Sequence, residues 1–227
     1  THVSGVDLIR DQYGDFYVLE DNLRTPSGVC YMLENRQISK RIYPTIMPKR
    51  NIKDVSNYPQ ILYKQLSSLS DKKNPTVALL TPGMYNSAYY EHSTLARLMG
   101  VELVEGRDLV MLNNNVLMKT SKGLEKIDVL YRRVDDDFLD PIAFNQGSVL
   151  GVPGILKAYK DGNIIIANSP GTGVADDKAT YIYVPKIIQY YLNEAPILKN
   201  LETFQLNDPD QLDIVCLLYT SPSPRDH

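Results

Sequence analysis

Two acids and an amide near the start of the chain have the residue types and the spacing of a metal site. Glu20 follows Asp7 by 13 residues, and Asn22 completes a Glu-x-Asn arrangement. Residues two apart on a strand face the same side, so a hairpin that turns near Gly14 would bring all three side chains to one face. Mg²⁺ prefers such hard oxygen ligands and takes waters and nucleotide phosphates at its other positions. We predict that Asp7, Glu20 and Asn22 hold magnesium; the alternative is a solvated hairpin rich in acids.

The residues around this trio predict the hairpin itself. Residues 6–10 and 16–19 are two β-rich runs, and residues 11–15 between them have the composition of a turn. Further along, residues 29–35 are expected to begin a helix or a tight turn. Residues 58–68 carry apolar side chains at helical spacing and predict a helix.

From residue 75 onward, strand patterns alternate with helix patterns, which predicts an α/β fold with a mostly parallel sheet. The expected strands cover residues 77–80, 101–104, 127–131 and 164–167. The expected helices cover residues 89–99, 148–159 and 176–192. A small hairpin is expected over residues 109–118, with its turn at residues 113–115.

Two arginines, Arg132 and Arg133, directly follow one of the expected strands. Ligands of open α/β sheets bind outside the carboxyl ends of the strands, and a guanidinium group there can fork onto a carboxylate or a phosphate. We prefer Arg132 as the binding member of this pair. Local ion pairing with the three acids at residues 135–137 is the alternative, because charge clusters also occur in structural networks.

A glycine-rich loop at residues 168–173 lies between the last expected strand and the longest expected helix. Backbone N–H groups at such a loop, next to a helix N-terminus, can bind an anion. Gly171, Thr172 and Gly173 are therefore candidate cofactor-binding residues, and a plain turn is the alternative. His92, beside Glu91, is interpreted as structural or as lying on the substrate side, because no opposed nucleophile is evident.

Residues 6–28, which contain the predicted metal trio, resemble the metal-binding hairpin of ATP-grasp ligases such as D-alanine–D-alanine ligase and glutathionylspermidine synthetase. In that family the matching Asp, Glu and Asn hold two magnesium ions on ATP, a role that the resemblance assigns to Asp7, Glu20 and Asn22. One departure is Gly5, which stands where many relatives have an arginine. Arg10 or Arg24 could supply that phosphate contact instead.

The order of the segments resembles the circularly permuted ATP-grasp family. The hairpin comes first here, and residues 75–192 resemble the Rossmann-like pre-ATP-grasp domain that normally opens the chain. Residues 80–92, 129–141 and 167–178 are similar to signatures of the permuted family. The resemblance implies an incomplete ATP-grasp fold divided into a metal-binding segment (1–45), a helical connector (46–74), a pre-ATP-grasp-like domain (75–200) and the start of a further lobe (201–215).

The resemblance implies an ATP- and Mg²⁺-dependent carboxylate–amine ligase that acts through an acyl phosphate on a small or peptide-like substrate. It implies that Lys178 contacts ATP, with an exposed helix lysine as the alternative, and it favours Arg132 because the loop after that strand is similar to one in glutathione synthetase. One rival is a non-catalytic relative that serves as a binding module. The other is a metal-dependent hydrolase, which would need histidine ligands, and the three histidines of the chain are scattered.

Composition limits the expected partners and setting. The net charge is −3 with no basic block, so nucleic acid and anionic membranes are not expected as partners. No apolar run approaches the roughly 20 residues of a membrane span, and no signal peptide is evident. Two cysteines without metal or redox spacing favour a reducing, cytoplasmic setting.

The two ends of the chain also carry expectations. The first residue is not Met, so the natural start is expected upstream. Residues 216–227 read as a translated sequencing adaptor, with a natural Ser/Pro-rich tail as the alternative. The natural sequence is then expected to break off near Val215, before the adenine pocket and the lid, and the fragment alone is expected to be inactive.

Overall fold

The structure is a computed structural model that describes residues 2–218. The chain forms two compact units. The large unit contains residues 2–4 and 23–172, and the small unit contains residues 5–22 and the chain from Gly173. The domain boundaries predicted from the sequence stay a prediction. An adaptor-derived tail is predicted for residues 216–227. Residues 219–227 lie outside the described residues, and residues 216–218 are the end of a helix, α8 (Pro209–Leu218).

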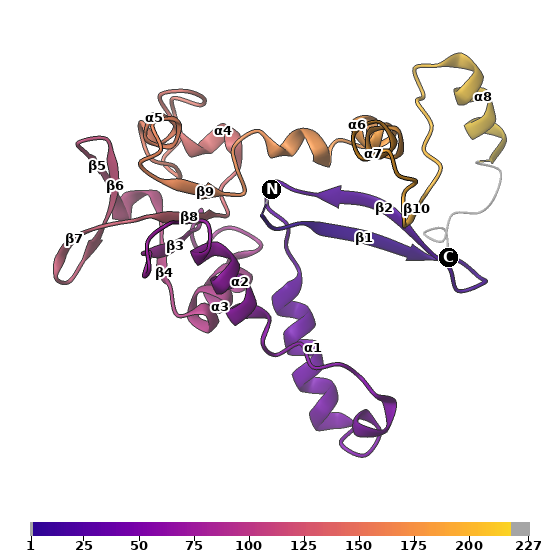
Figure 1. The fold of residues 1–227 in the computed structure, drawn as a ribbon, viewed down its shortest axis with the longest axis horizontal. Helices are drawn as coiled ribbons and strands as arrows, with labels where there is room; N and C mark the ends of the chain where they lie inside the picture. Colours follow the sequence, from indigo (N-terminus) through magenta and orange to yellow (C-terminus); the bar gives the residue numbers. More distant parts are fainter. Residues whose placement is uncertain (1, 219–227) are drawn as a thin grey trace. The chain divides into compact units, whose positions relative to one another are not determined.

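The large unit is built on a parallel sheet with the order β4-β3-β8-β9 (Figure 1). Its strands are β3 (Val77–Leu80), β8 (Val129–Arg132), β4 (Glu102–Val104) and β9 (Ile165–Ala167). All four predicted strands and the α/β class are confirmed. The strand expected at residues 127–131 starts two residues later, because Ile127 still pairs with Val116 of a neighbouring sheet.

Both faces of this sheet are buried, which explains why its strands are continuous apolar runs. One face packs a core that includes Leu80, Leu130 and Ile155. The other face packs a core that includes Leu79 and Leu95. Figure 1 shows α2 (Tyr58–Ser67) and α3 (Tyr89–Met99) on one side of the sheet, and α4 (Asp136–Leu139) and α5 (Ile155–Lys160) on the other.

A separate antiparallel sheet follows β4 and the short helix η2 (Gly106–Asp108). It contains β5 (Leu109–Leu112), β6 (Asn115–Thr120) and β7 (Gly123–Lys126). Asn113 and Asn114 both have positive φ, 49° and 60°, as a tight hairpin turn requires. The hairpin over 109–118 is thus confirmed, and β7 is an additional strand.

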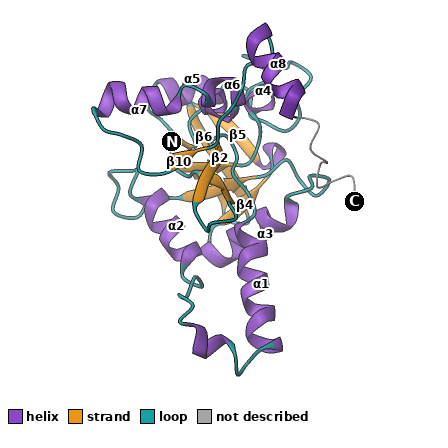
Figure 2. Ribbon diagram, turned by 90° about the vertical axis from the view of Figure 1, so that its right-hand side faces the viewer, coloured by secondary structure: helices purple, strands orange, loops and turns teal. Residues whose placement is uncertain are grey.

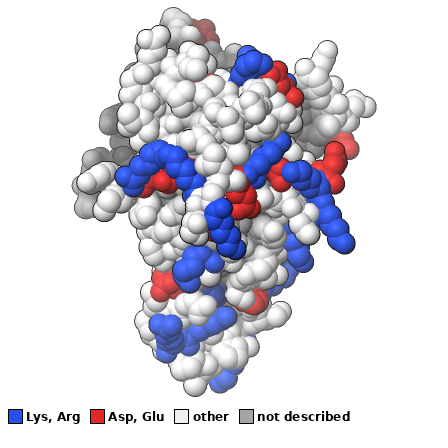
Figure 3. Space-filling model, turned by 90° about the vertical axis from the view of Figure 1, so that its left-hand side faces the viewer, with Lys and Arg blue, Asp and Glu red and all other residues white. Residues whose placement is uncertain are grey.

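Among the described residues on the face in Figure 3, lysines and arginines lie among acids, so that face has no broad field of one sign.

Two predicted helices are corrected by the structure. The helix expected at 148–159 begins only at Ile155, because Gly151 lies against backbone: a Cβ there would come within 2.1 Å of the Leu139 carbonyl oxygen. The helix expected at 176–192 is three pieces: η3 (Thr172–Asp176), α6 (Lys178–Tyr181) and α7 (Val184–Leu192). Pro185 in the first turn of α7 lacks the N–H that would continue a helix from α6.

The helix or tight turn expected to begin at residues 29–35 is a helix. Residues 29–35 open α1 (Val29–Ile42), which leads away from the sheet of the large unit, and the chain returns through η1 (Met47–Arg50) (Figure 2). The last turn of α1 contains Lys40 and Arg41, which favour the negative end of the helix dipole.

The small unit contains the predicted hairpin. Strand β1 (Gly5–Arg10) pairs antiparallel with β2 (Phe16–Asn22), and β10 (Lys199–Asn200) adds to β2 in parallel. The helices α6, α7 and α8 (Pro209–Leu218) complete the unit. No helix within residues 2–218 is long and apolar enough to cross a bilayer.

Candidate functional site

The hairpin brings the predicted metal ligands together. The strand register pairs Asp7 with Glu20 and Gly5 with Asn22, so the predicted adjacency of Asp7 and Glu20 is confirmed. The Asn22 amide donates to the Asp7 carboxylate, with Nδ2 and Oδ2 3.4 Å apart. Side chains directly opposite on an antiparallel pair lie roughly 5 Å apart at Cβ, which is close enough to share one cation.

A β-bulge places the acid pair and the buried Val18 on opposite faces of the hairpin. The register shifts between Asp7 and Leu8, so that Leu8 pairs with Val18. In a regular strand, Val18 and Glu20 would face the same side. Because the bulge resets the alternation, Val18 is buried at 6% exposure, while Glu20 shares the face of Asp7. The sequence spacing alone does not reveal this irregularity.

Lys178, the predicted ATP contact, forms an ion pair with Glu20. It opens α6, where the Asp177 side chain caps the helix by accepting from Ala179 N at 2.7 Å. The Lys178 side chain is 63% exposed and that of Glu20 is 21% exposed. A cationic group thus already lies on one of the predicted metal ligands, and both residues belong to the small unit.

The donor set at the hairpin fits magnesium in its chemistry. Two carboxylates and a carboxamide oxygen are hard ligands. Residues 2–218 contain no group of three His, Cys, Asp or Glu side chains that could hold a metal. A metal at this hairpin therefore needs the Asn22 oxygen, together with water or phosphate oxygens, besides Asp7 and Glu20.

The glycine-rich loop has partners within the large unit. Gly171 N donates to Asp136 Oδ2 at 3.3 Å. The Thr172 hydroxyl donates to the carbonyls of Leu23 and Ser169, each at 3.0 Å. These contacts favour the plain-turn alternative at Gly171 and Thr172. Gly173 begins the part of the chain that belongs to the small unit, and phosphate binding by these residues stays a prediction.

Asn168, at the start of this loop, is a residue that the sequence analysis did not single out. Its side chain is buried and makes four hydrogen bonds to backbone. Oδ1 accepts from His2 N and Val3 N at 2.7 and 2.8 Å, and Nδ2 donates to the carbonyls of Val3 and Leu23, each at 2.6 Å. Asn168 therefore holds both chain segments from which the hairpin departs.

Arg132 is fully buried and bonded on all three nitrogens. Nε donates to the carbonyl of Asn168 at 2.8 Å, Nη1 to that of Val134 at 2.9 Å and Nη2 to that of Ser169 at 3.2 Å. Nη2 also pairs with Asp136 at 2.8 Å. Burial lowers the pKa of Arg132, against the opposing effect of Asp136. These contacts favour the structural alternative, and the predicted binding role of Arg132 stays a prediction.

The neighbouring Arg133 lines a cavity. Its guanidinium group donates to the carbonyls of Pro26 and Thr25 at 2.5 and 3.2 Å and lies 3.6 Å from the Glu91 carboxylate. Its Nε is buried and has no hydrogen-bond partner among the described residues. The sequence signal for Arg133 was the same pair of arginines. Both side chains are buried, and the structure separates them because Arg133 lines the cavity and Arg132 does not.

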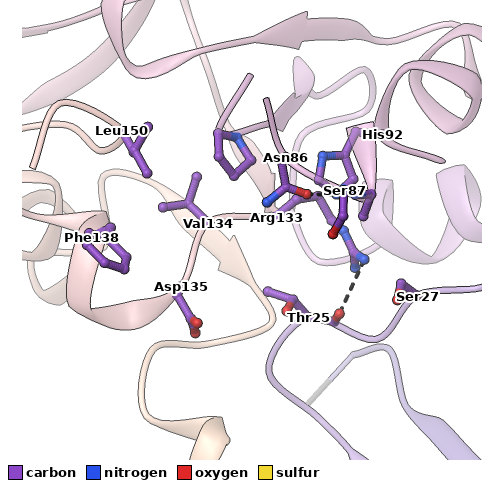
Figure 4. Close-up of a pocket in the computed structure, with 12 residues that line it drawn as sticks. Thr25, Ser27, Asn86, Ser87, His92, Arg133, Val134, Asp135, Phe138 and Leu150 are labelled. Atoms are coloured by element: carbon purple, nitrogen blue, oxygen red, sulfur yellow. Dashed lines mark hydrogen bonds between the residues drawn. The ribbon is translucent and has the colours of Figure 1, made fainter. Parts of the chain in front are cut away.

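The cavity measures about 330 Å³ and lies entirely within the large unit. Figure 4 shows a polar side with Asn86, Ser87 and His92, and an apolar side with Phe138 and Leu150. A polar and an apolar wall together suit a small molecule that has both kinds of surface.

His92 in this cavity is held as a neutral imidazole. Its Nδ1 lies 2.9 Å from the Thr81 hydroxyl. Burial, together with the nearby positive charge of Arg133, lowers the pKa of His92 to about 4. His92 is therefore uncharged near pH 7 and available as a hydrogen-bonding group.

This shift predicts a pH-dependent stability. Because the folded pKa lies below the ordinary value of 6.5, the unfolded chain binds the proton more readily. The contribution of neutral His92 to the free energy of unfolding is present in full above pH 6.5. As the pH falls toward 4, the free energy of unfolding drops by about 3 kcal/mol. Urea unfolding at several pH values between 4 and 7.5 gives the free energy of unfolding as a function of pH. This free energy should change less steeply with pH in His92→Gln than in the wild type. Equal slopes would contradict a neutral, buried His92.

Comparison with known proteins gives the chain a family context. A family model described as "A circularly permuted ATPgrasp" matches residues 1–218. An uncharacterized protein of Mycobacterium tuberculosis (strain ATCC 25618 / H37Rv) is 52% identical over 206 residues, which are 90% of this chain and 37% of that protein. An uncharacterized protein of Synechocystis is 52% identical over 205 residues, which are 89% of this chain and 43% of that protein.

A relative with a functional name is more distant. A Frankia casuarinae protein named "Putative glutamate--cysteine ligase 2-2" is 40% identical over 217 residues, which are 94% of this chain and 25% of that protein. The chain thus spans less than half the length of each of these relatives.

Proposed function

Because the chain belongs to the circularly permuted ATP-grasp family, we propose that it forms part of an ATP-dependent ligase that joins a carboxylate to an amine. The observation that carries this proposal is the strand register that sets Asp7 opposite Glu20, with Asn22 on the same face. The ligase name of the Frankia relative supports the class of reaction.

The proposed reaction proceeds in two balanced steps. A substrate carboxylate oxygen attacks the γ-phosphorus of ATP, and ADP leaves. The amine nitrogen then attacks the acyl carbon and loses a proton, and phosphate leaves. Such transfers need positioning and charge neutralisation more than covalent help.

The hairpin residues take the roles that their chemistry allows. Asp7, Glu20 and Asn22 would hold magnesium, which neutralises phosphate charge when bound. The Lys178 ammonium group is ion-paired with the Glu20 carboxylate in the structure. We propose that it exchanges that carboxylate for a phosphate oxygen when the metal and nucleotide bind. Gly171, Thr172 and Gly173 stay candidates for a phosphate contact, and Arg132 is proposed to act through the loop whose carbonyls it holds.

Charge-neutral substitutions at the hairpin test this proposal. Glu20→Gln keeps the size and one acceptor oxygen but loses the charge, so Mg²⁺ binding in the presence of inorganic triphosphate should weaken about tenfold or more. Lys178→Met should have opposite effects on the binding of free Mg²⁺ and on the binding of the Mg²⁺–triphosphate complex. Mg²⁺ alone should bind more tightly because Glu20 is released, whereas the Mg²⁺–triphosphate complex should bind more weakly. Calorimetric titration of the chain measures both quantities.

Asp15→Asn is the matched control for these variants. Asp15, on the same hairpin, also ion-pairs a lysine, Lys199 of β10 at 2.7 Å, but it lies in the turn region away from Asp7. The Asp15→Asn variant should bind Mg²⁺ and the Mg²⁺–triphosphate complex as the wild type does. Equal Mg²⁺ affinity in Glu20→Gln and the wild type would remove the hairpin from the site and favour the binding-module rival.

A further inference from the structure

The cavity of the large unit lies where the connections of its sheet diverge. From β3 the chain passes through α3 to β4 on one side, and from β8 it passes through α5 to β9 on the other. In an open α/β sheet, the crevice at such a reversal, outside the carboxyl ends of the strands, is where ligands bind. Pro82, just after β3, and Arg133, just after β8, both line the cavity.

Two independent features make this crevice favourable to a negative charge. Ser87 and Ala88 on its wall immediately precede α3, an 11-residue helix, whose dipole is positive at that end. The N–H groups of Ala88 and Tyr89 are bonded to Asn86, at 2.9 and 3.0 Å, so the dipole is the contribution of the helix. Arg133 provides the second feature. Its side chain is 1% exposed, and its buried Nε has no partner among the described residues, although buried donors are nearly always satisfied.

The Arg133 charge is only partly offset by its surroundings. Glu91 lies at 3.6 Å, beyond hydrogen-bonding distance, and its other oxygen accepts from Gly28 N at 2.7 Å. Asp135, the acid on the cavity wall, is paired with Arg24 at 2.7 Å. The positive end of α3 and the guanidinium group therefore act on the cavity together.

The remaining walls select among anions. Val134, Phe138 and Leu150 form an apolar side, which an inorganic anion would leave without a partner. Neutral His92 and Asn86 supply hydrogen-bonding groups opposite it (Figure 4). A volume of about 330 Å³ is at the lower end of ligand pockets, so the ligand is small.

From these features we propose that the cavity binds a small organic acid, with its carboxylate toward Arg133 and the start of α3 and its apolar body against Phe138 and Leu150. As the subsite for the acid substrate, this assignment rests on the proposed ligase function, whereas binding of the acid itself does not. The cavity needs neither metal nor nucleotide for this step.

The test uses N-acetyl-L-leucine as the acid and its amide, N-acetyl-L-leucinamide, as the uncharged match. Calorimetric titration of the chain, without metal or nucleotide, should show the acid binding at least tenfold more tightly than the amide. Ser87→Phe, at an exposed wall residue, should fill the mouth and abolish this binding while the fold is kept. Ser121→Phe, in the exposed turn between β6 and β7, is the matched control and should bind as the wild type does. Arg133→Met should remove the preference for acid over amide, with circular dichroism to confirm folding.

The outcomes separate this proposal from its rivals. Equal binding of acid and amide, binding that survives Ser87→Phe, or no binding of the acid would overturn it, as would binding of inorganic phosphate in place of the acid. Glu20→Gln should leave acid binding unchanged. If acid binding holds but the hairpin test fails, the cavity stays a carboxylate site and only its place in a ligase is lost. If acid binding fails and the hairpin test holds, the ligase proposal stands without this subsite.

Discussion

Replacing Asn168 with alanine should lower the free energy of unfolding by about 3 kcal/mol. The side chain is 1% exposed and bonds two separate backbone segments through its single amide. Its loss would leave the N–H groups of His2 and Val3 and the carbonyls of Val3 and Leu23 without these partners. Some of these groups would regain water, which keeps the expected loss below the sum of four buried hydrogen bonds.

Urea unfolding of the chain measures this effect. Asn35→Ala, at an exposed position on α1, is the matched control and should change stability by less than about 0.5 kcal/mol. A loss below about 1 kcal/mol in Asn168→Ala would show that the four hydrogen bonds are replaced by water at little cost.

The same substitution bears on function through the hairpin. Residues 3 and 23, which Asn168 ties down, flank the strands that carry Asp7 and Glu20. Metal binding at the hairpin should nevertheless survive in Asn168→Ala, because the β1–β2 register is fixed by its own backbone ladder. The two measurements therefore separate stability from ligand chemistry.

The parallel sheet could be predicted from the sequence because its strands are short, wholly buried apolar runs such as Val77–Leu80. The acid pair could be predicted because Asp7 and Glu20 are close in sequence and the turn between them is recognisable. Helix extents could not be predicted to the same degree. At Gly151, contact with the backbone of a distant segment overrides a helical pattern. At Pro185, the missing backbone N–H divides a predicted helix.

The cavity could not be predicted, because its walls come from segments far apart in the chain. Arg133 reaches the carbonyl of Pro26, and Glu91 accepts from Gly28, contacts that no local pattern encodes. The choice between Arg132 and Arg133 depended on which side of β8 each side chain leaves. Alternation along a strand shows only that they differ, not which of them meets a cavity.

Glu91→Gln should lower the free energy of unfolding by about 3 kcal/mol and, at the same time, strengthen acid binding in the cavity. Glu91 is fully buried; its Oε2 accepts from Gly28 N and Cys30 N at the start of α1. Because one oxygen accepts both bonds, the carboxamide oxygen of glutamine can keep both. The substitution leaves Arg133 as a buried charge without a counter-ion, which is costly to the fold and favourable to an incoming carboxylate.

The opposite signs of the two effects make this variant informative. A role of Arg133 confined to packing predicts the stability loss with no gain in affinity for N-acetyl-L-leucine, and that result would contradict the carboxylate site. The matched control is Glu34→Gln, an exposed acid on α1, which should change neither quantity. Because Glu91 touches both the start of α1 and the guanidinium group of Arg133, its charge sets a balance between the stability of the large unit and the anion affinity of the cavity.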